Sequence, residues 1–233
     1  MILKVTSWNI WFGKHYHDIA KHLKNVDADV IGLQEVIQDL DGKHNTAENI
    51  AKELGYHWKY EETVQFPYEG RTISWGNAIL SKHKILNTKL HDLTKGDERK
   101  TALEATLEIA DKQLTIVSTH FTHTHQQASE VQEHEAKSLL SVVPNELAIV
   151  MGDFNALPDS KTIQIITERL HHTDKQLDPS WCMYIDGCEV CRIDQLTHRL
   201  DYIFATNDLK VHSFETDYSK GSDHLPISTT FEL

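Results

Sequence analysis

The sequence has few of the residues that divide a chain into separate modules. Its 233 residues include 5 prolines and 10 glycines, and no proline-, glycine- or serine-rich stretch interrupts it. A chain of this length is long enough to bury a large core by itself. We therefore expect a single domain over residues 1–233.

Cysteine and long apolar runs are also scarce. Three cysteines, an odd number, suit a reducing cytoplasm better than a disulfide framework. No apolar run is long enough to span a bilayer. The N-terminus, Met1-Ile2-Leu3-Lys4-Val5, starts in a strand-like pattern rather than in a charged and then apolar signal segment. We expect a cytoplasmic protein without a membrane anchor.

Positive charge is in short supply as well. The chain has 23 basic and 35 acidic residues, with a formal net charge of -12. Bulk attraction to nucleic acid or to anionic membranes is therefore not built in, although a local basic rim stays compatible with this balance. Histidine, by contrast, is abundant at 16 residues, which directs attention to metal or phosphate chemistry.

One stretch combines an apolar run with closely spaced polar residues: Ile149-Val150-Met151-Gly152-Asp153-Phe154-Asn155-Ala156-Leu157-Pro158. Its apolar residues predict a buried strand, and Gly152 allows a close backbone approach. Asp153 and Asn155 then follow at alternating positions and point the same way if the strand continues. Ligand sites commonly lie at such strand ends. An ordinary turn that uses Asp and Asn explains this stretch equally well.

Apolar periodicity predicts alternating strands and helices along the chain. Strands are expected near residues 2–10, 29–35, 56–60, 77–81, 100–109, 113–119, 149–152 and 201–204, with a hairpin turn at Ala110-Asp111-Lys112. Helices are expected near residues 15–25, 46–54, 126–142 and 161–170, with Gly55 as a C-cap. In the third helix, we expect Val131 to face the core and Glu135 to face solvent.

Two loops carry weaker functional hypotheses. Arg71 lies with several aromatic residues between two expected strands and is a candidate for a substrate lip, although such residues equally pack onto the core. The irregular segment 178–198 holds all three cysteines. Cys188 and Cys191 have the spacing of half a zinc knuckle, which Cys182 and His198, or Asp194, would complete. Buried or free thiols are the alternative.

Polar residues recur where apolar runs meet loops. These residues are Asn9, Glu35, His120, Asp153, Asn155, Asp201, Asp223 and His224. A buried carboxylate needs a partner, and a cation is the simplest one for Glu35. Gathered at one edge, the carboxylates predict a hard-oxygen site for Mg²⁺ or Mn²⁺, with histidines left for proton handling and charge stabilisation.

A set of motifs in this order resembles the endonuclease/exonuclease/phosphatase superfamily, with its deoxyribonuclease-I-like fold. The motifs are Ser7-Trp8-Asn9, Leu33-Gln34-Glu35, Gly76-Asn77-Ala78-Ile79-Leu80-Ser81, Ser118-Thr119-His120, Gly152-Asp153-Phe154-Asn155, Leu200-Asp201-Tyr202-Ile203-Phe204 and Ser222-Asp223-His224-Leu225-Pro226. The resemblance spans nearly the whole chain. It implies an α/β fold, a four-layer sandwich of two mixed sheets flanked by helices, with the site at one edge.

The resemblance also implies roles for the motif residues. Glu35 looks like the main Mg²⁺ ligand, with Asn9 close by and Asp223 completing the same or a second site. Asp153 is similar to the carboxylate that orients the attacking water, and Asn155 to the amide that holds that water or a phosphate oxygen. His224, paired with Asp201, and His120 would contact the phosphate as charge builds. Asn77 is a further candidate for substrate binding. Water would attack phosphorus in line.

One departure from the family pattern narrows the branch. Trp11 stands where the abasic-site and tyrosyl-DNA repair branches carry an acidic residue, so membership of those branches is not expected. The expected partner is a phosphate-ester substrate, and the net charge of -12 favours a short or single-stranded nucleic acid or a small phosphorylated molecule over long duplex DNA. We expect the protein to be a monomer. A phosphodiesterase or nuclease is the first hypothesis. A phosphomonoesterase is the second, and a non-catalytic binding module is the third.

Overall fold

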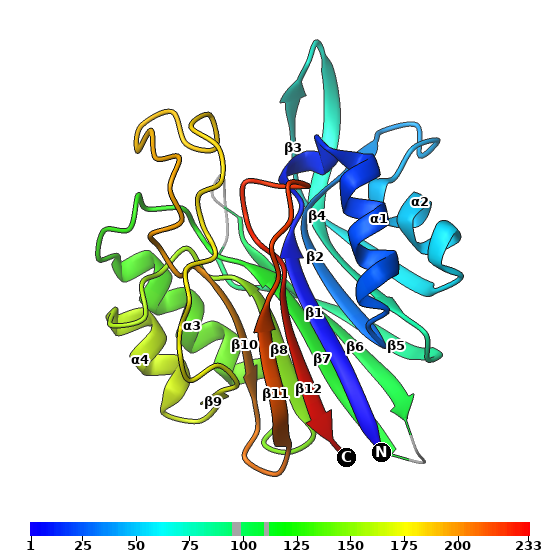
Figure 1. The fold of residues 1–233 in the computed structure, drawn as a ribbon, viewed down its shortest axis with the longest axis vertical. Helices are drawn as coiled ribbons and strands as arrows, with labels where there is room; N and C mark the ends of the chain where they lie inside the picture. The colour runs from blue at the N-terminus through cyan, green and yellow to red at the C-terminus, as the bar shows by residue number, and fades with distance from the viewer. Residues whose placement is uncertain (95–98, 110–111) are drawn as a thin grey trace.

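Two mixed β-sheets face each other in the computed structural model, which describes residues 1–94, 99–109 and 112–233 (Figure 1). The first sheet has the order β11 (Lys210–Thr216), β12 (Ile227–Glu232), β1 (Ile2–Asn9), β2 (Val30–Asp39), β4 (Arg71–Ser81) and β3 (His57–Tyr68). The second has the order β5 (Ile85–Asp92), β6 (Thr101–Ile109), β7 (Lys112–His120), β8 (Ala148–Asp153), β10 (Asp201–Ala205) and β9 (His171–His172). The pairs β1–β2 and β7–β8 are parallel.

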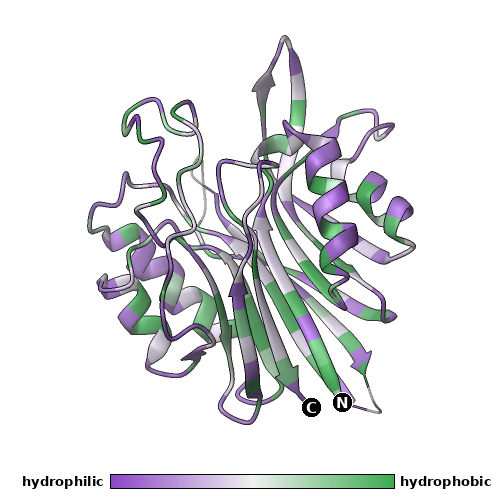
Figure 2. Ribbon diagram, in the orientation of Figure 1, coloured by the Kyte–Doolittle hydropathy of each residue, from purple (hydrophilic) through white to green (hydrophobic). Residues whose placement is uncertain are grey.

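Helices cover the outer face of each sheet. α1 (Tyr16–Val26) and α2 (Thr46–Leu54) pack on the first sheet, and α3 (Glu130–Val142) and α4 (Lys161–Thr167) pack on the second (Figure 1). A short 3₁₀ turn, Trp11–Gly13, follows β1. Apolar strand residues such as Leu3, Leu103 and Met151 fill the space between the sheets, and the hydrophobic colouring of the strands follows this core (Figure 2). The expected four-layer α/β sandwich is thus confirmed.

The region between residues 56 and 81 differs from the sequence prediction. Two short strands joined by a loop were expected, but β3 and β4 are long strands that pair from His57↔Ser81 to Tyr68↔Arg71. Half-buried Val64, Phe66 and Tyr68 alternate with exposed Gln65 and Pro67 in β3, which makes the hairpin a half-buried ribbon rather than a loop. Residues 110–111 of the expected Ala110-Asp111-Lys112 turn lie outside the described residues.

The third helix also departs from its predicted faces. It begins at Glu130 rather than at Gln126, and Val131 is exposed. Glu135 is fully buried. Its carboxylate accepts hydrogen bonds from the backbone N–H and the hydroxyl of Thr122, which offset the cost of burying it. Gln132 donates to the carbonyls of Thr122 and Asn155, at 2.7 and 2.9 Å. The buried polar face of α3 therefore holds the segment that follows β7.

Within the described ranges, no helix is long and apolar enough to cross a membrane. The segment 178–198 is irregular, as expected from its sequence, and lies beside the C-terminal end of β8 (Figure 1). It is fastened at its ends by backbone pairing of Trp181 with His198 and with His224. Trp181, Cys182 and Cys188 of this segment form a small apolar cluster with Leu200.

Candidate active site

Three neighbouring strands of the second sheet align the centre of the site. In the strand register, Asp153 of β8 lies opposite His120 of β7 on one side and Asp201 of β10 on the other. Gly152 makes this alignment possible, because its φ is 157° and a Cβ there would lie 2.0 Å from the carbonyl oxygen of Thr119. A side chain at position 152 would push β8 away from β7 and separate the three polar groups.

The first sheet supplies the facing carboxylates. β2 does not end at Glu35 as predicted but continues to Asp39, with a register shift between Leu33 and Val36. Within that bulge Glu35 has a φ of 56°, a left-handed conformation that is uncommon for a residue with a side chain. Bulges next to active sites re-aim a side chain. This bulge brings Glu35 to Asn9 at the end of β1.

Asn9 joins the two sheets at this edge. Its amide nitrogen donates to Glu35 Oε1 at 3.2 Å and to Asp153 Oδ2 at 3.1 Å. Its amide oxygen accepts from the backbone N–H of Trp11 at 3.1 Å. The prediction that Asn9 offers an oxygen to a metal stays a prediction, since this oxygen accepts one hydrogen bond and keeps a second lone pair. Asn9 also holds two carboxylates in place.

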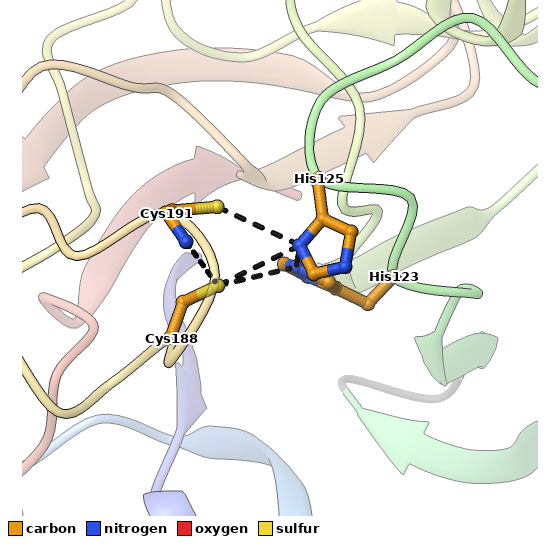
Figure 3. A group of neighbouring side chains, drawn as sticks. All are labelled: His123, His125, Cys188 and Cys191. Atoms are coloured by element: carbon orange, nitrogen blue, oxygen red, sulfur yellow. Dashed lines mark hydrogen bonds between the residues drawn. The ribbon is translucent and has the colours of Figure 1, made fainter.

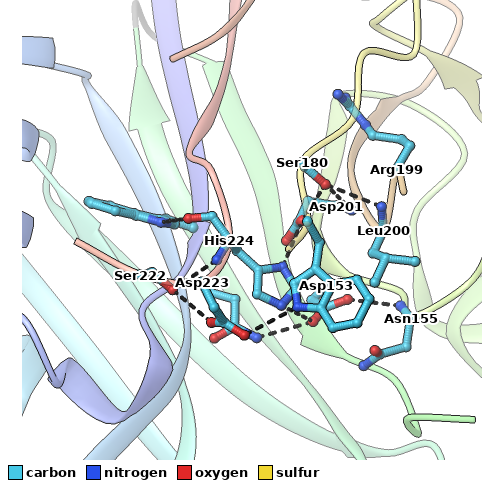
Figure 4. Close-up of polar contacts among 12 residues, drawn as sticks. Asp153, Asn155, Ser180, Arg199, Leu200, Asp201, Ser222, Asp223 and His224 are labelled. Atoms are coloured by element: carbon cyan, nitrogen blue, oxygen red, sulfur yellow. Dashed lines mark hydrogen bonds and ion pairs between the residues drawn. The ribbon is translucent and has the colours of Figure 1, made fainter. Parts of the chain in front are cut away.

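His224 and Asp201 form a buried charged pair (Figure 4). His224 Nδ1 lies 2.9 Å from Asp201 Oδ2, which also accepts from the hydroxyl of Ser180 at 2.6 Å. Burial lowers the pKa of His224, but the carboxylates of Asp201, Asp153 and Asp223 raise it, and the net result is a pKa well above the ordinary value. His224 is therefore an imidazolium at neutral pH, with Nε2 3.6 Å from Asp153 Oδ2.

His120 has the opposite electrostatic character. Burial and the charge of Lys100 lower its pKa well below the ordinary value, so the ring is neutral. The amide nitrogen of Asn155 donates to His120 Nε2 at 3.0 Å and to the carbonyl of Phe121 at 3.1 Å. Nε2 is thus an acceptor, and the proton resides on Nδ1, which has no partner among the described residues. His120 therefore has one N–H group without a hydrogen-bond partner among the described residues.

Burial, together with repulsion between neighbouring carboxylates, disfavours the charged forms of the acidic groups. Burial and the neighbouring Asp223 raise the pKa of Glu35 to about 8. Burial and the neighbouring Asp201 raise the pKa of Asp153 to about 7 against the opposing effect of His224, and burial raises that of Asp223. Glu35 Oε2 is buried and has no partner among the described residues. An orphaned carboxylate oxygen among acidic neighbours fits a hard divalent cation.

One cavity of about 420 Å³ is lined by six of the residues described above, namely Glu35, His120, Asp153, Asn155, Asp223 and His224. Its remaining described walls come from Trp11, Phe12, Trp75, Lys100, His123, His125, Trp181, Gly187, Cys188, Glu189 and Val190. A larger cavity of about 530 Å³ lies along β9 and β11, but its lining holds none of the strand-end residues described above. Chemistry rather than size therefore identifies the candidate active site.

Two residues that were predicted to bind substrate lie outside the described lining of this cavity. Arg71 is paired with Asp39 at 2.6 Å at the start of β4, and Asn77 is buried and donates to the carbonyl of Thr101 at 3.3 Å. Neither belongs to the described lining of the cavity. Asn77 therefore connects β4 to β6 across the sandwich, and Arg71 stabilises the β3–β4 hairpin.

Sequence reasoning missed several residues that shape the site. His123 Nδ1 lies 2.8 Å from Asn155 Oδ1, and Trp181 Nε1 donates to Asp223 Oδ2 at 3.2 Å. The two histidines after His120 were visible in the sequence, but no spacing linked His123 to Asn155. Cys182 and His198 lie outside the group that contains the other two cysteines, which brings together His123, His125, Cys188 and Cys191.

Comparisons with known proteins identify the family. The sequence profile of the Endonuclease/Exonuclease/phosphatase family matches residues 6–224, and the chain belongs to this family, whose members are hydrolases of phosphate esters and are generally dependent on divalent metals. No curated protein sequence matches the chain significantly.

Solved structures share the fold. An endonuclease/exonuclease/phosphatase from Beutenbergia cavernae is 20% identical with a TM-score of 0.80, over 100% of this chain and 72% of the other. A mannosyl-6-phosphatase from Bacteroides thetaiotaomicron is 16% identical with a TM-score of 0.76, over 99% of this chain and 100% of the other. ANGEL2, a 2′,3′-cyclic phosphatase, is 17% identical with a TM-score of 0.77, over 99% of this chain and 95% of the other.

Proposed function

We propose that this protein is a Mg²⁺-dependent phosphodiesterase that hydrolyses short or single-stranded nucleic acids. The observation that carries the proposal is the meeting of Glu35, Asp153 and Asp223 with the imidazolium of His224 in one cavity. Carboxylates suit a hard cation, and a cationic donor suits a phosphoryl oxygen.

The carboxylates of Glu35 and Asp223 are the proposed metal ligands, with Asn9 as their support. Glu35 contributes the orphaned Oε2 atom, and Asp223 is oriented by Trp181 and by the hydroxyl of Ser222. When bound, Mg²⁺ supplies charge neutralisation at the phosphoryl group. Orientation of the water, acceptance of its proton and contact with the phosphate are assigned to side chains of the protein.

Asp153 is the proposed base. Burial raises the pKa of Asp153 to about 7, and a general base works best when its pKa lies near neutral pH. Its Oδ1 accepts from the backbone N–H of Asn155 at 2.8 Å, which fixes the carboxylate so that the other oxygen faces the cavity groups. Asp153 orients a water and accepts its proton as the water attacks phosphorus.

His224 is the proposed donor to the phosphate, with His120 beside it. Asp201 holds His224 by Nδ1, so Nε2–H is presented on the side of Asp153. The neutral ring of His120 lies beside the same carboxylate, with Nε2 3.4 Å from Asp153 Oδ2, whereas its Nδ1–H is buried and does not face the cavity. A donor that is fixed before the reaction stabilises charge as it develops on the phosphoryl oxygens.

Aromatic side chains favour a nucleotide as the group next to the phosphate. Trp11 stacks on Tyr184 with ring centroids 5.6 Å apart, and Phe12 stacks on Tyr68 at 5.1 Å. Trp11, Phe12 and Trp75 line the cavity beside the carboxylates. Nucleobases stack on such surfaces, and the net charge of -12 favours a substrate with few phosphates over a long duplex.

A phosphomonoesterase is the second candidate. Segment 187–190 walls one side of the cavity, which suits a small terminal phosphate ester. One of the similar structures carries the name of a phosphomonoesterase, a mannosyl-6-phosphatase, whereas the 2′,3′-cyclic phosphate in the name of ANGEL2 is a cyclic diester. Monoester hydrolysis uses the same proposed donor and the same base, so the choice depends on what the cavity accepts beside the phosphate.

One panel of substrates separates the two candidates. The purified protein with Mg²⁺ is assayed against short single-stranded oligonucleotides, bis(p-nitrophenyl) phosphate, 2′,3′-cyclic nucleotides, nucleoside monophosphates and hexose 6-phosphates. We expect diesters to have the higher kcat/KM, and Trp11→Ala to lower it for oligonucleotides more than for bis(p-nitrophenyl) phosphate. A preference for monoesters overturns the diesterase proposal, and no metal-dependent hydrolysis of any ester overturns both.

A further inference from the structure

Two segments that are distant in the sequence bring four metal-ligating side chains together beside the active site. His123 and His125 follow β7, whereas Cys188 and Cys191 lie in the irregular segment before β10. One ligand atom from each residue lies within 4.8 Å of every other (Figure 3). The catalytic proposal uses none of these four side chains as a ligand.

The distances within this His2Cys2 cluster (His123, His125, Cys188, Cys191) have the size of a metal coordination shell. Cys188 Sγ lies 3.6 Å from His125 Nδ1 and 3.9 Å from His123 Nε2, and Cys191 Sγ lies 3.6 Å from His125 Nδ1. His123 Nε2 and His125 Nδ1 are 3.0 Å apart. In a tetrahedron with Zn–S of about 2.3 Å and Zn–N of about 2.05 Å, S···N edges are about 3.6 Å and the N···N edge is about 3.3 Å.

We propose that His123, His125, Cys188 and Cys191 bind one structural Zn²⁺ ion. Two thiolates and two imidazoles are a ligand set typical of closed zinc sites, and thiolate ligands disfavour Mg²⁺. Four protein ligands leave no position for substrate. The site is therefore separate from the carboxylate centre of Glu35 and Asp223, and the inference goes beyond the proposed hydrolysis.

Hydrogen bonds around the cluster support its role as a metal site. The backbone N–H of Cys191 points to Cys188 Sγ at 3.2 Å, which stabilises a thiolate at that sulfur. His123 Nδ1 is 2.8 Å from Asn155 Oδ1, an acceptor, so the proton lies on Nδ1 and Nε2 faces the sulfur atoms with its lone pair. Metal-bound histidines commonly donate their second N–H to such an oxygen.

The structure also revises the ligand set that the sequence predicts. Cys182 is buried and its thiol donates to the carbonyl of Tyr184 at 3.0 Å, and His198 Nδ1 is 2.9 Å from the hydroxyl of Thr197. Neither residue belongs to the cluster. The two histidines after β7 take their places, because the cavity edge brings that segment against the cysteine segment.

A zinc ion here would fasten one wall of the active-site cavity. Cys188, Glu189 and Val190 line the cavity, but only Cys188 is buried and Val190 is 72% exposed, so apolar burial holds this wall at Cys188 alone. Segment 178–198 also lacks regular secondary structure apart from isolated bridges. A cross-link between Cys188 and His123 holds the wall at a fixed distance from Asn155.

Zinc content tests the proposal without a substrate. Protein purified without added metal is measured by elemental analysis, and we expect about one zinc per chain in the wild type and in Glu35→Gln, Cys182→Ser and His198→Ala. Cys188→Ser and Cys191→Ser should each retain less than about a tenth of an equivalent and melt at a lower temperature. Retention of zinc by Glu35→Gln would show that the zinc site is distinct from the carboxylate centre.

Two measurements on the wild-type chain keep the test decisive if a cysteine variant fails to fold. Removal of zinc and addition of Co²⁺ should give the visible absorption of tetrahedral cobalt with thiolate ligands. Cys188 and Cys191 should become reactive toward a thiol reagent only after zinc is removed. Wild-type protein without zinc and without a cobalt spectrum, or with Cys188 and Cys191 joined in a disulfide, overturns the proposal.

Discussion

Replacement of Glu35 by Gln should stabilise the metal-free protein and abolish its response to Mg²⁺. Glu35 Oε1 accepts from Asn9, a contact that a carboxamide oxygen preserves, while Oε2 has no partner among the described residues. The substitution therefore removes a buried charge and conserves shape. Neither expected effect requires knowledge of the substrate.

The magnitude follows from the pKa of Glu35. A rise from 4.5 to about 8 corresponds to about 5 kcal/mol at most, at about 1.36 kcal/mol per pH unit. Although Oε2 is buried, Glu35 as a whole is only half-buried and solvent screens part of the effect, so we expect about 2 kcal/mol to remain. The folded pKa lies above the unfolded one, so stability is full below pH 4.5 and is lost as the pH rises toward 8.

Thermal melting of the two proteins, with and without Mg²⁺, measures both effects. Without metal, Glu35→Gln should melt about 4–8 °C above the wild type at pH 8, with little difference near pH 4.5. Mg²⁺ should raise the melting temperature of the wild type only, since a ligand stabilises the state that binds it. Glu146→Gln, an exposed substitution beyond the other end of β8, is the matched control. Equal melting temperatures at pH 8, or equal stabilisation of both proteins by Mg²⁺, would refute the reasoning.

Three further predictions concern activity on the best substrate. Chelation by EDTA should abolish hydrolysis and Mg²⁺ or Mn²⁺ should restore it, so full activity in EDTA would contradict the metal assignment. Asp153→Asn and His224→Ala should each lower kcat by about a hundredfold or more with small changes in KM, because both act mainly in the transition state; a rise in KM alone would disprove the assigned role. Asp201→Asn removes a charge that raises the pKa of His224, so the alkaline limb of the kcat profile should move to lower pH by about 1–3 units, and an unmoved limb would exclude His224 as the cationic donor.

Much of the strand-end chemistry was predictable because apolar runs reveal where core strands stop. Asp153 and Asp201 each border a run of buried residues, and the structure places them opposite each other in the register of β8 and β10. The family motifs added the order of the strands. Fold class and family were therefore accessible from the sequence, and the placement of these two carboxylates agrees with it.

The direction in which the Glu35 side chain points could not be predicted from the sequence in the same way. The sequence continues with apolar residues after Glu35, but no residue signals the bulge that gives it a φ of 56°. A non-glycine residue in this conformation is held by its surroundings rather than by local preference. Similarly, the β3–β4 hairpin carries polar and aromatic residues in alternation, which a reading based on continuous apolar runs treats as a loop.

The sequence predicted only the two cysteines of the His2Cys2 cluster. Cys188 and Cys191 have the zinc spacing, and a local search for further ligands selects Cys182 and His198 because they are near in sequence. The structure instead brings His125 to Cys188 across 63 positions. Contacts of this length depend on how two loops meet at the edge of the sandwich, which periodicity does not report.

Asn155 connects the two centres. Its amide oxygen accepts from His123, and its amide nitrogen donates to His120 and to the carbonyl of Phe121. Rotation of the amide by half a turn would set its nitrogen against the N–H of His123 and its oxygen against the carbonyl, replacing hydrogen bonds with repulsive pairs. The proposed zinc ion on His123 Nε2 would keep the proton of that ring on Nδ1. That proton would fix the amide of Asn155, and the amide would in turn hold the ring of His120 beside Asp153.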